Sequence, residues 1–205
     1  MASLQQALVN GKFNEKQKAA IEKAMQKAQN VVNNNKSAKD EEHDLAVVIC
    51  CMENIQVRPI MHMKTHDIQG KFMANATPTK MIGGEAGGSF VHKGAYSEGP
   101  LQVVVGSKGA VIYGTIDKMV PGLGYLLAWD RPDDSHATNK VYVEAGDPSK
   151  LMKMEWSDIQ TKMNKSDTYS EFLDKDTSAS ASAELRYIGN NAALVDANFD
   201  RVVAN

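Results

Sequence analysis

The chain lacks most of the features that identify secreted, membrane-spanning and disulfide-stabilised proteins. Its 205 residues include only two cysteines, adjacent at Cys50 and Cys51, so no disulfide can join distant parts of the fold. No segment approaches the roughly 18 uninterrupted apolar residues that a membrane-spanning helix needs. The first residues, MASLQQALVNGKF, lack the basic and apolar regions of a signal peptide. We therefore expect the protein to be cytoplasmic in the cell that produces it, with reduced thiols.

An excess of charge of one sign is also missing. The 23 Lys and Arg residues nearly balance the 25 Asp and Glu residues, which leaves a net charge of -2. A chain of this composition has no overall attraction for the phosphate backbone of DNA or RNA. We therefore expect no nucleic-acid partner.

Familiar catalytic and metal-binding motifs are absent. The sequence has no Gly-x-Ser-x-Gly, His-Glu-x-x-His or Cys-x-x-Cys. His62 and His66 are four residues apart, which on a strand separates them by about 13 Å, too far to share one metal ion. The glycine-rich stretch at 83–88 has no Gly-Lys-Ser/Thr ending, so it predicts a hairpin or loop rather than a phosphate-binding turn. The sequence favours a non-enzymatic protein that uses no metal and no cofactor.

A series of short β-rich runs separated by turn residues is the strongest positive signal. Four of these runs follow one another between residues 101 and 144, with glycine-, proline- or aspartate-containing segments between them. This pattern predicts a mainly β fold, an antiparallel β-sandwich, over the domain 45–205. The expected strands are 45–52, 56–64, 70–76, 89–93, 101–105, 110–113, 125–129, 140–144, 183–188 and 193–199.

The first 44 residues are expected to form a helical extension and a polar linker. After a short helix at 4–10, a longer helix at 14–32 has apolar residues at three- and four-residue spacing and lysines on its other faces. Such a basic amphipathic helix either packs on the sandwich or lies on an anionic membrane. The residues that we expect to contact the membrane are Lys16, Ile21, Lys23, Met25, Lys27 and Val31.

One further helix is expected within the sandwich domain. At about 149–163, apolar residues recur at helical spacing, and Asp147 or Ser149 can cap the segment. We expect this helix to pack against one of the two sheets.

Three aromatic residues are the candidate binding residues. Trp129 ends a strand just before a polar loop, where an indole either belongs to the core or forms an exposed platform for a lipid headgroup or a sugar. Core packing is the favoured interpretation of Tyr113 and Tyr142. If these side chains bind a ligand, the expected partners are membrane lipid headgroups or glycans.

Several of these segments resemble a known family. The segments GSKGAVIYG at 106–114, LLAW at 126–129 and NKVYVE at 139–144, followed by Trp156, resemble the small jasmonate-induced proteins of plants, which are associated with defence. The layout of an N-terminal amphipathic helix, the run LAVVICCMEN at 45–54 and a hairpin at 125–144 also resembles the actinoporin and fungal-lectin type of sandwich. In actinoporins the helix inserts to line a pore, and aromatic loops hold a choline headgroup. The matching loop here, 130–139, has no aromatic residue.

These resemblances imply a function without catalysis. The leading hypothesis is a plant defence protein, insecticidal or cytolytic, that binds target membranes through sandwich loops. Residues 1–35 would then form a pore, with the protein assembled as a homo-oligomer on the membrane. The alternative is a lectin-like defence protein that binds glycans and forms no pore.

Overall fold

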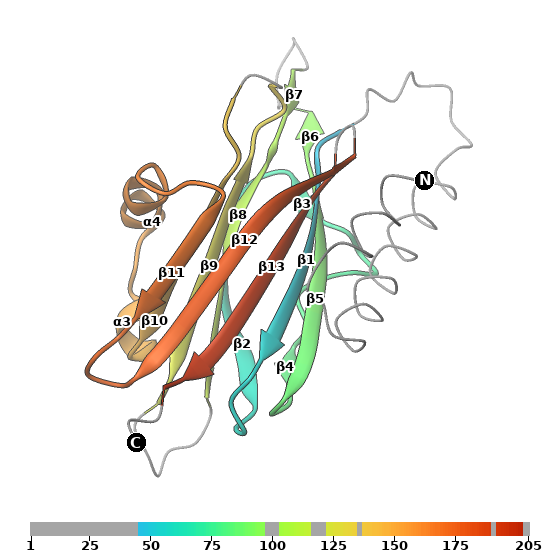
Figure 1. Cartoon of the computed structure of the whole chain (residues 1–205). Coiled ribbons are helices and arrows are strands. Elements are labelled where there is room, and N and C mark those ends of the chain that lie inside the picture. The colour runs from blue at the N-terminus through green and yellow to red at the C-terminus, as the bar shows by residue number, and fades with distance from the viewer. Residues whose placement is uncertain (1–44, 97–102, 116–121, 135–136, 190–191, 203–205) are drawn as a thin grey trace.

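A two-layer β-sandwich with two short helices on one side forms the described part of the chain (Figure 1). The computed structural model describes residues 45–96, 103–115, 122–134, 137–189 and 192–202. The predicted mainly β fold is confirmed. The helical extension and linker predicted over residues 1–44, with the membrane-contacting residues assigned to them, lie outside the described residues.

Each layer of the sandwich is one sheet. Sheet A contains, in spatial order, β11 (Tyr169–Leu173), β12 (Ala179–Gly189), β13 (Ala192–Arg201), β1 (Val47–Asn54), β5 (Ala86–Lys93) and β3 (Lys71–Phe72). Sheet B contains β10 (Lys140–Gly146), β9 (Gly124–Arg131), β8 (Ser107–Thr115), β2 (Ile60–Gln69) and β4 (Met81–Ile82). A two-stranded ribbon joins β6 (Ala95–Tyr96) to β7 (Val104–Val105).

One strand pair departs from the predicted antiparallel pattern. β1 pairs with β5 in antiparallel fashion on one side but with β13 in parallel fashion on the other. The register runs from Val47 opposite Ala192 to Asn54 opposite Phe199. The first and last long strands of the sandwich therefore lie side by side in the middle of sheet A (Figure 1).

The main hydrophobic core lies between the two sheets. It is formed by the inward half of each strand, because side chains alternate between the two faces of a sheet. On sheet B, β9 is buried on both faces. Its inward residues Leu127 and Trp129 join the main core, whereas Leu126 and Ala128 pack outward against a second cluster. This double burial explains why the run Tyr125 to Trp129 is continuously apolar in the sequence.

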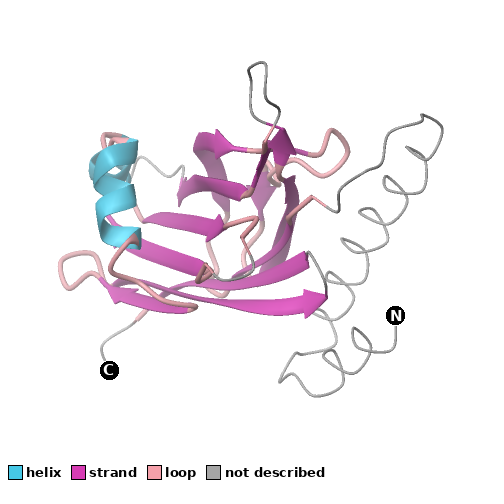
Figure 2. Cartoon of the chain, turned by 90° about the horizontal axis from the view of Figure 1, so that it is seen from above, coloured by secondary structure: helices cyan, strands magenta, loops and turns pink. Residues whose placement is uncertain are grey.

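The second cluster lies beneath two helices that cover the outer face of sheet B. The helix expected at 149–163 is two helices, α3 (Pro148–Met152) and α4 (Trp156–Met163) (Figure 1), and this helical part lies at one side of the strands (Figure 2). Asp147 caps α3 by accepting a hydrogen bond from the backbone N–H of Ser149. The chain leaves the helical path between the two, and Lys64 of β2 donates to the carbonyls of Met152 and Met154 there. The predicted packing of helical structure on a sheet is confirmed, with an interruption that the apolar spacing did not reveal.

A buried polar chain joins the two sheets at one end of the core. Nε1 of Trp129 donates to Oγ of Ser107 at 3.1 Å, and this oxygen lies 2.8 Å from Nδ1 of His92. Nε2 of His92 in turn lies 2.9 Å from a carboxylate oxygen of Asp67. The imidazole also packs edge-on against Phe72 and Trp129. Burial lowers the pKa of His92, and the neighbouring Asp67 carboxylate opposes this effect in part.

The lowered pKa of His92 predicts a loss of stability in acid. The folded state holds the proton of this ring less tightly than the unfolded chain does. The free energy of unfolding should therefore fall as the pH drops below about 6.5, the pKa of histidine in the unfolded chain, and should continue to fall until the pH passes the lower pKa of His92 in the folded state. The variant His92→Gln should show a shallower decrease between about pH 7 and about pH 5, as urea unfolding at several pH values would reveal. An equal or steeper decrease in the variant would contradict this assignment.

Candidate functional site

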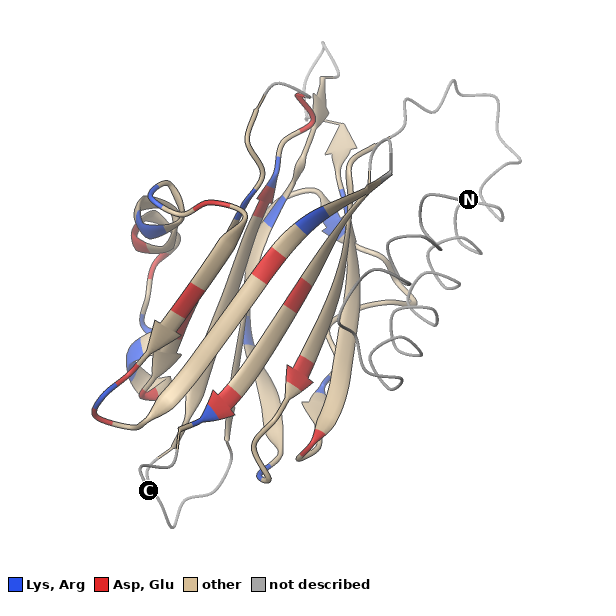
Figure 3. Ribbon diagram, viewed as in Figure 1, with Lys and Arg blue, Asp and Glu red and all other residues tan. Residues whose placement is uncertain are grey.

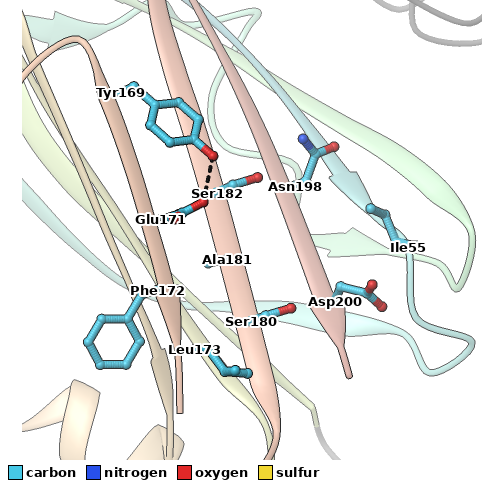
Figure 4. Close-up of a pocket in the computed structure, with 10 residues that line it drawn as sticks. All are labelled: Ile55, Tyr169, Glu171, Phe172, Leu173, Ser180, Ala181, Ser182, Asn198 and Asp200. Atoms are coloured by element: carbon cyan, nitrogen blue, oxygen red, sulfur yellow. Dashed lines mark hydrogen bonds between the residues drawn. The ribbon is translucent and has the colours of Figure 1, made fainter. Parts of the chain in front are cut away.

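A groove with a volume of about 550 Å³ lies on the outer face of sheet A (Figure 4). Its walls come from β11, β12 and β13, and the chain just after β1 closes one side. The lining residues are Ile55, Tyr169, Glu171, Phe172, Leu173, Ser180, Ala181, Ser182, Asn198 and Asp200.

Strand register brings these side chains together. Glu171, Ser182 and Asn198 stand opposite one another across the three strands, and so do Leu173, Ser180 and Asp200. Because residues two apart share a face, the two rows and Tyr169 above them line one surface. The groove is therefore about 13 Å long and about 10 Å wide, from strand rise and spacing.

The groove combines an aromatic ring with groups that accept or donate hydrogen bonds. The Tyr169 side chain is 53% exposed, and its hydroxyl donates to Glu171 at 2.8 Å (Figure 4). This hydrogen bond raises the pKa of Tyr169 above its ordinary value. Two carboxylates, two serine hydroxyls and one amide line the groove together with this ring, and no Lys or Arg is among the lining residues. Such a set suits a ligand rich in hydroxyl groups.

Exposed aliphatic side chains surround the end of the sandwich onto which the groove opens. We call this set the aliphatic rim. It includes Val57, 78% exposed in the turn after β1, and Met81, 58% exposed on β4. The full set is Ile55, Val57, Met81, Leu173 and Val202. Ile55 and Leu173 also line the groove, so the two features are continuous.

Cationic residues accompany the rim along the sequence. Arg58 directly follows Val57, Lys80 precedes Met81, and Arg201 precedes Val202. Exposed aliphatic groups next to cations are typical of surfaces that lie at the boundary of a bilayer. The end of the sandwich that carries β4 and the arrowheads of β1 and β13 (Figure 1) combines these aliphatic groups with charges of both signs, because carboxylates also lie at both arrowheads (Figure 3).

Carboxylates lie next to the groove on the same face of sheet A (Figure 3). Glu184 of β12 stands opposite Asp196 of β13, and Arg186 bonds to both carboxylates at 3.2 and 3.3 Å. Burial raises the pKa of Asp196, although Arg186 opposes the effect. These groups form an ion-pair network on the sheet surface rather than part of the groove.

Two of the three predicted binding residues belong to the core. Trp129 and Tyr113 are fully buried, and their polar atoms bond to Ser107 and to the carbonyl of Thr79. Tyr142 packs partly buried beside the cluster under α3 and α4, and its hydroxyl donates to Glu144. None of these three side chains lines the groove. A ligand-binding role for these residues stays a prediction, and Trp129 and Tyr113 offer no exposed surface for it.

Sequence reasoning missed the groove because it did not identify β11. The alternation of exposed and half-buried residues along YSEFL is the signal that could have found this strand. The expected strand at 183–188 also began too late, since β12 starts at Ala179, where alternating Ser and Ala place hydroxyls outward and small side chains in the core.

Metal-binding and membrane-spanning features do not appear in the part of the chain that the structure describes. There, no group of three or more His, Cys, Asp and Glu side chains is placed to hold a metal ion. Across the same residues, none of the helices has the length and apolar character needed to cross a bilayer.

Comparison with known proteins relates most of the chain to one family. A family model described as Nakanori-like protein matches residues 4–192. The jasmonate-induced protein homolog of Atriplex canescens is 26% identical over 182 residues, which cover 88% of this chain and 90% of that protein. The predicted resemblance to jasmonate-induced proteins is therefore confirmed.

Two solved structures match the chain to different degrees. The crystal structure of the lipid binding protein Nakanori matches with a TM-score of 0.62 and 21% identity, over 94% of this chain and 91% of that one. The Xerocomus chrysenteron lectin XCL matches with a TM-score of 0.44 and 8% identity, over 75% of this chain and 99% of that one. The likeness to Nakanori confirms the sandwich.

The burial of Trp129 predicts a structural phenotype for its replacement. Trp129→Phe removes the hydrogen bond to Ser107 and leaves space in the core, so the free energy of unfolding should fall by about 1–3 kcal/mol. The folded variant should bind vesicles as the original chain does. Urea unfolding and vesicle sedimentation measure the two effects. Lost binding with unchanged stability would instead support the predicted platform role.

Proposed function

The chain belongs to the Nakanori-like family, and we propose that it is a defence protein that binds lipid membranes of a target organism. The aliphatic rim forms the membrane contact, and the groove beside it receives a headgroup. The observation that carries this proposal is the pairing of exposed aliphatic residues with cations at the end onto which the groove opens. Aliphatic groups enter the boundary region of the bilayer, while the exposed cations Lys80 and Arg201 stay among the phosphates.

Relatives support the proposal at two levels. Nakanori is described as a lipid binding protein, and it shares this fold. The relative from Atriplex canescens is described as jasmonate-induced, which supports a role in plant defence. We infer that the protein is made in the cytoplasm and meets target membranes after release.

Pore formation is the finer part of the proposal. The sequence at 14–32 predicts a basic amphipathic helix, and such a helix can enter the bilayer boundary once the sandwich is attached. Insecticidal or cytolytic activity would follow if several copies assembled on the membrane. The residues assigned to this step are Lys16, Ile21, Lys23, Met25, Lys27 and Val31.

A carbohydrate-binding defence protein without pore formation is the second candidate function. The hydroxyl, amide and carboxylate groups of the groove, with the exposed Tyr169 ring, favour it. Glycan binding in solution together with an absence of vesicle binding would select this function over the first.

Acidic substitutions in the aliphatic rim should weaken membrane binding. Val57→Asp and Met81→Asp should each lower vesicle affinity by about tenfold, because each removes an aliphatic group worth about 1.5 kcal/mol and adds a charge to the boundary. Vesicle sedimentation with phosphatidylcholine vesicles measures the change.

Val103→Asp provides the matched control for these variants. Val103 is 60% exposed and lies next to β7, at the opposite end of the sandwich (Figure 1). This variant should keep the original affinity. Equal losses in all three variants would show that the rim is not the contact surface.

Removal of residues 1–35 should separate binding from leakage. The shortened chain should retain the sandwich, as circular dichroism would show, and should still sediment with vesicles. Dye release from those vesicles should be abolished, because the predicted helix is missing. Undiminished dye release by the shortened chain would refute the pore proposal and leave membrane binding intact.

A further inference from the structure

We propose that the groove on sheet A is a binding site for a neutral sugar headgroup, so that the membrane ligand of this protein is a glycolipid. This inference rests on the proposed membrane-binding function and adds the chemical class of the ligand. It also makes the groove and the aliphatic rim parts of a single site.

The charge of the groove excludes a phosphate as its occupant. Glu171 and Asp200 both line the groove, and no Lys or Arg lies among the residues that line it. A phosphodiester placed there would meet two carboxylates and no compensating cation, and like charges at short range repel strongly. The exposed cations of this end, Lys80 and Arg201, adjoin the rim residues Met81 and Val202 in the sequence and do not line the groove.

The number and spread of polar groups favour a sugar over an ammonium group. Ser180, Ser182 and Asn198 supply hydroxyl and amide groups that both donate and accept hydrogen bonds. An ammonium group donates only, and would leave these donors without partners. A sugar presents several hydroxyls that each donate and accept, spread over a distance comparable with the groove.

Tyr169 supplies the apolar surface that a sugar ring also needs. One face of a pyranose exposes mainly C–H groups, which pack on an aromatic ring. The Tyr169 hydroxyl already donates to Glu171, and this bond holds the exposed ring beside the polar row (Figure 4). The ring and the acceptors are therefore ordered before a ligand arrives, which lowers the entropic cost of binding.

The position of the groove matches a headgroup that projects from a bilayer. Its lowest row contains Leu173 and Asp200, and Ile55 lies beside them in the aliphatic rim. Tyr169 is four residues from Leu173 along β11, which places it about 13 Å further from the rim. When the rim enters the bilayer boundary, the long axis of the groove points away from the membrane, and its side chains lie at the level of the headgroups. The lipid chains would remain in the membrane while the sugar lies along the sheet.

The test compares the full chain on vesicles of four compositions. These are phosphatidylcholine alone and phosphatidylcholine mixed with a monohexosylceramide, with phosphatidylserine or with phosphatidylethanolamine. The chain should bind the monohexosylceramide vesicles about tenfold more tightly than the others, the gain expected from one or two charge-assisted hydrogen bonds. Preference for phosphatidylserine or phosphatidylethanolamine, or equal binding to all four, would overturn the inference.

Substitutions within the groove should remove the preference for the sugar headgroup. Tyr169→Ala and Glu171→Gln should each lower affinity for the monohexosylceramide vesicles by about fivefold or more, so that each variant binds these vesicles and phosphatidylcholine vesicles about equally. Asp158→Asn is the matched control, because Asp158 is an exposed carboxylate on α4, which packs on the outer face of sheet B, away from the groove. A sugar preference that survives both groove variants, or falls equally in the control, would overturn the assignment to the groove.

Failure of this inference and failure of the proposed function give different results. Vesicle binding that depends on Val57 but shows no sugar preference overturns the inference alone. An absence of binding to every vesicle overturns both. Binding to a soluble glycoside without any vesicle binding overturns the glycolipid and supports the lectin-like alternative.

Discussion

The parallel pairing of β1 with β13 is the constraint on which the rest of this structure depends. It inserts the last strand of the chain between β12 and β1, so that six strands form one sheet. Its register places Cys50 beside Val195 on the inward face and Cys51 beside Asp196 on the outward face. A shift of one residue would exchange these faces and bury the Asp196 carboxylate in the core, at a cost that the fold could not offset. The register is therefore fixed by hydrophobic burial.

The same register divides the outer face of sheet A into three zones. An apolar cluster that includes Ile49, Val91 and Leu194 lies toward the start of β1. The ion-pair network around Asp196 follows, and the groove lies beyond it toward the end of β13. Each zone arises from residues spaced two apart on neighbouring strands. The groove is thus mainly a consequence of how β11, β12 and β13 align, and the chain after β1 contributes only Ile55 to it.

The sequence predicted the strands that are apolar enough to be recognised without their neighbours. The run from Tyr125 to Trp129 is buried on both faces, so its strand was evident. The short strand β11 and the alternating Ser and Ala at the start of β12 have weak local signals, because their stability comes from cross-strand pairing. The groove depends on these two segments. The groove could therefore not be predicted from the sequence, which indicated Trp129 as the binding residue instead. The indole of Trp129 lies in the core, where it donates a hydrogen bond to the buried Ser107.

Lipid binding and sugar binding need not be competing interpretations of this fold. An aliphatic rim alone would attach the protein to any fluid bilayer, because burial of apolar area does not distinguish headgroups. A hydroxyl-rich groove alone would bind an isolated sugar weakly. The hydrogen bonds that the groove forms to the sugar mostly replace hydrogen bonds that both partners make to water, so the net gain in binding free energy is small. Continuity of the two at Ile55 and Leu173 makes the second contact intramolecular once the first has formed, which raises its effective concentration. The membrane contact would then supply affinity and the groove would supply selectivity.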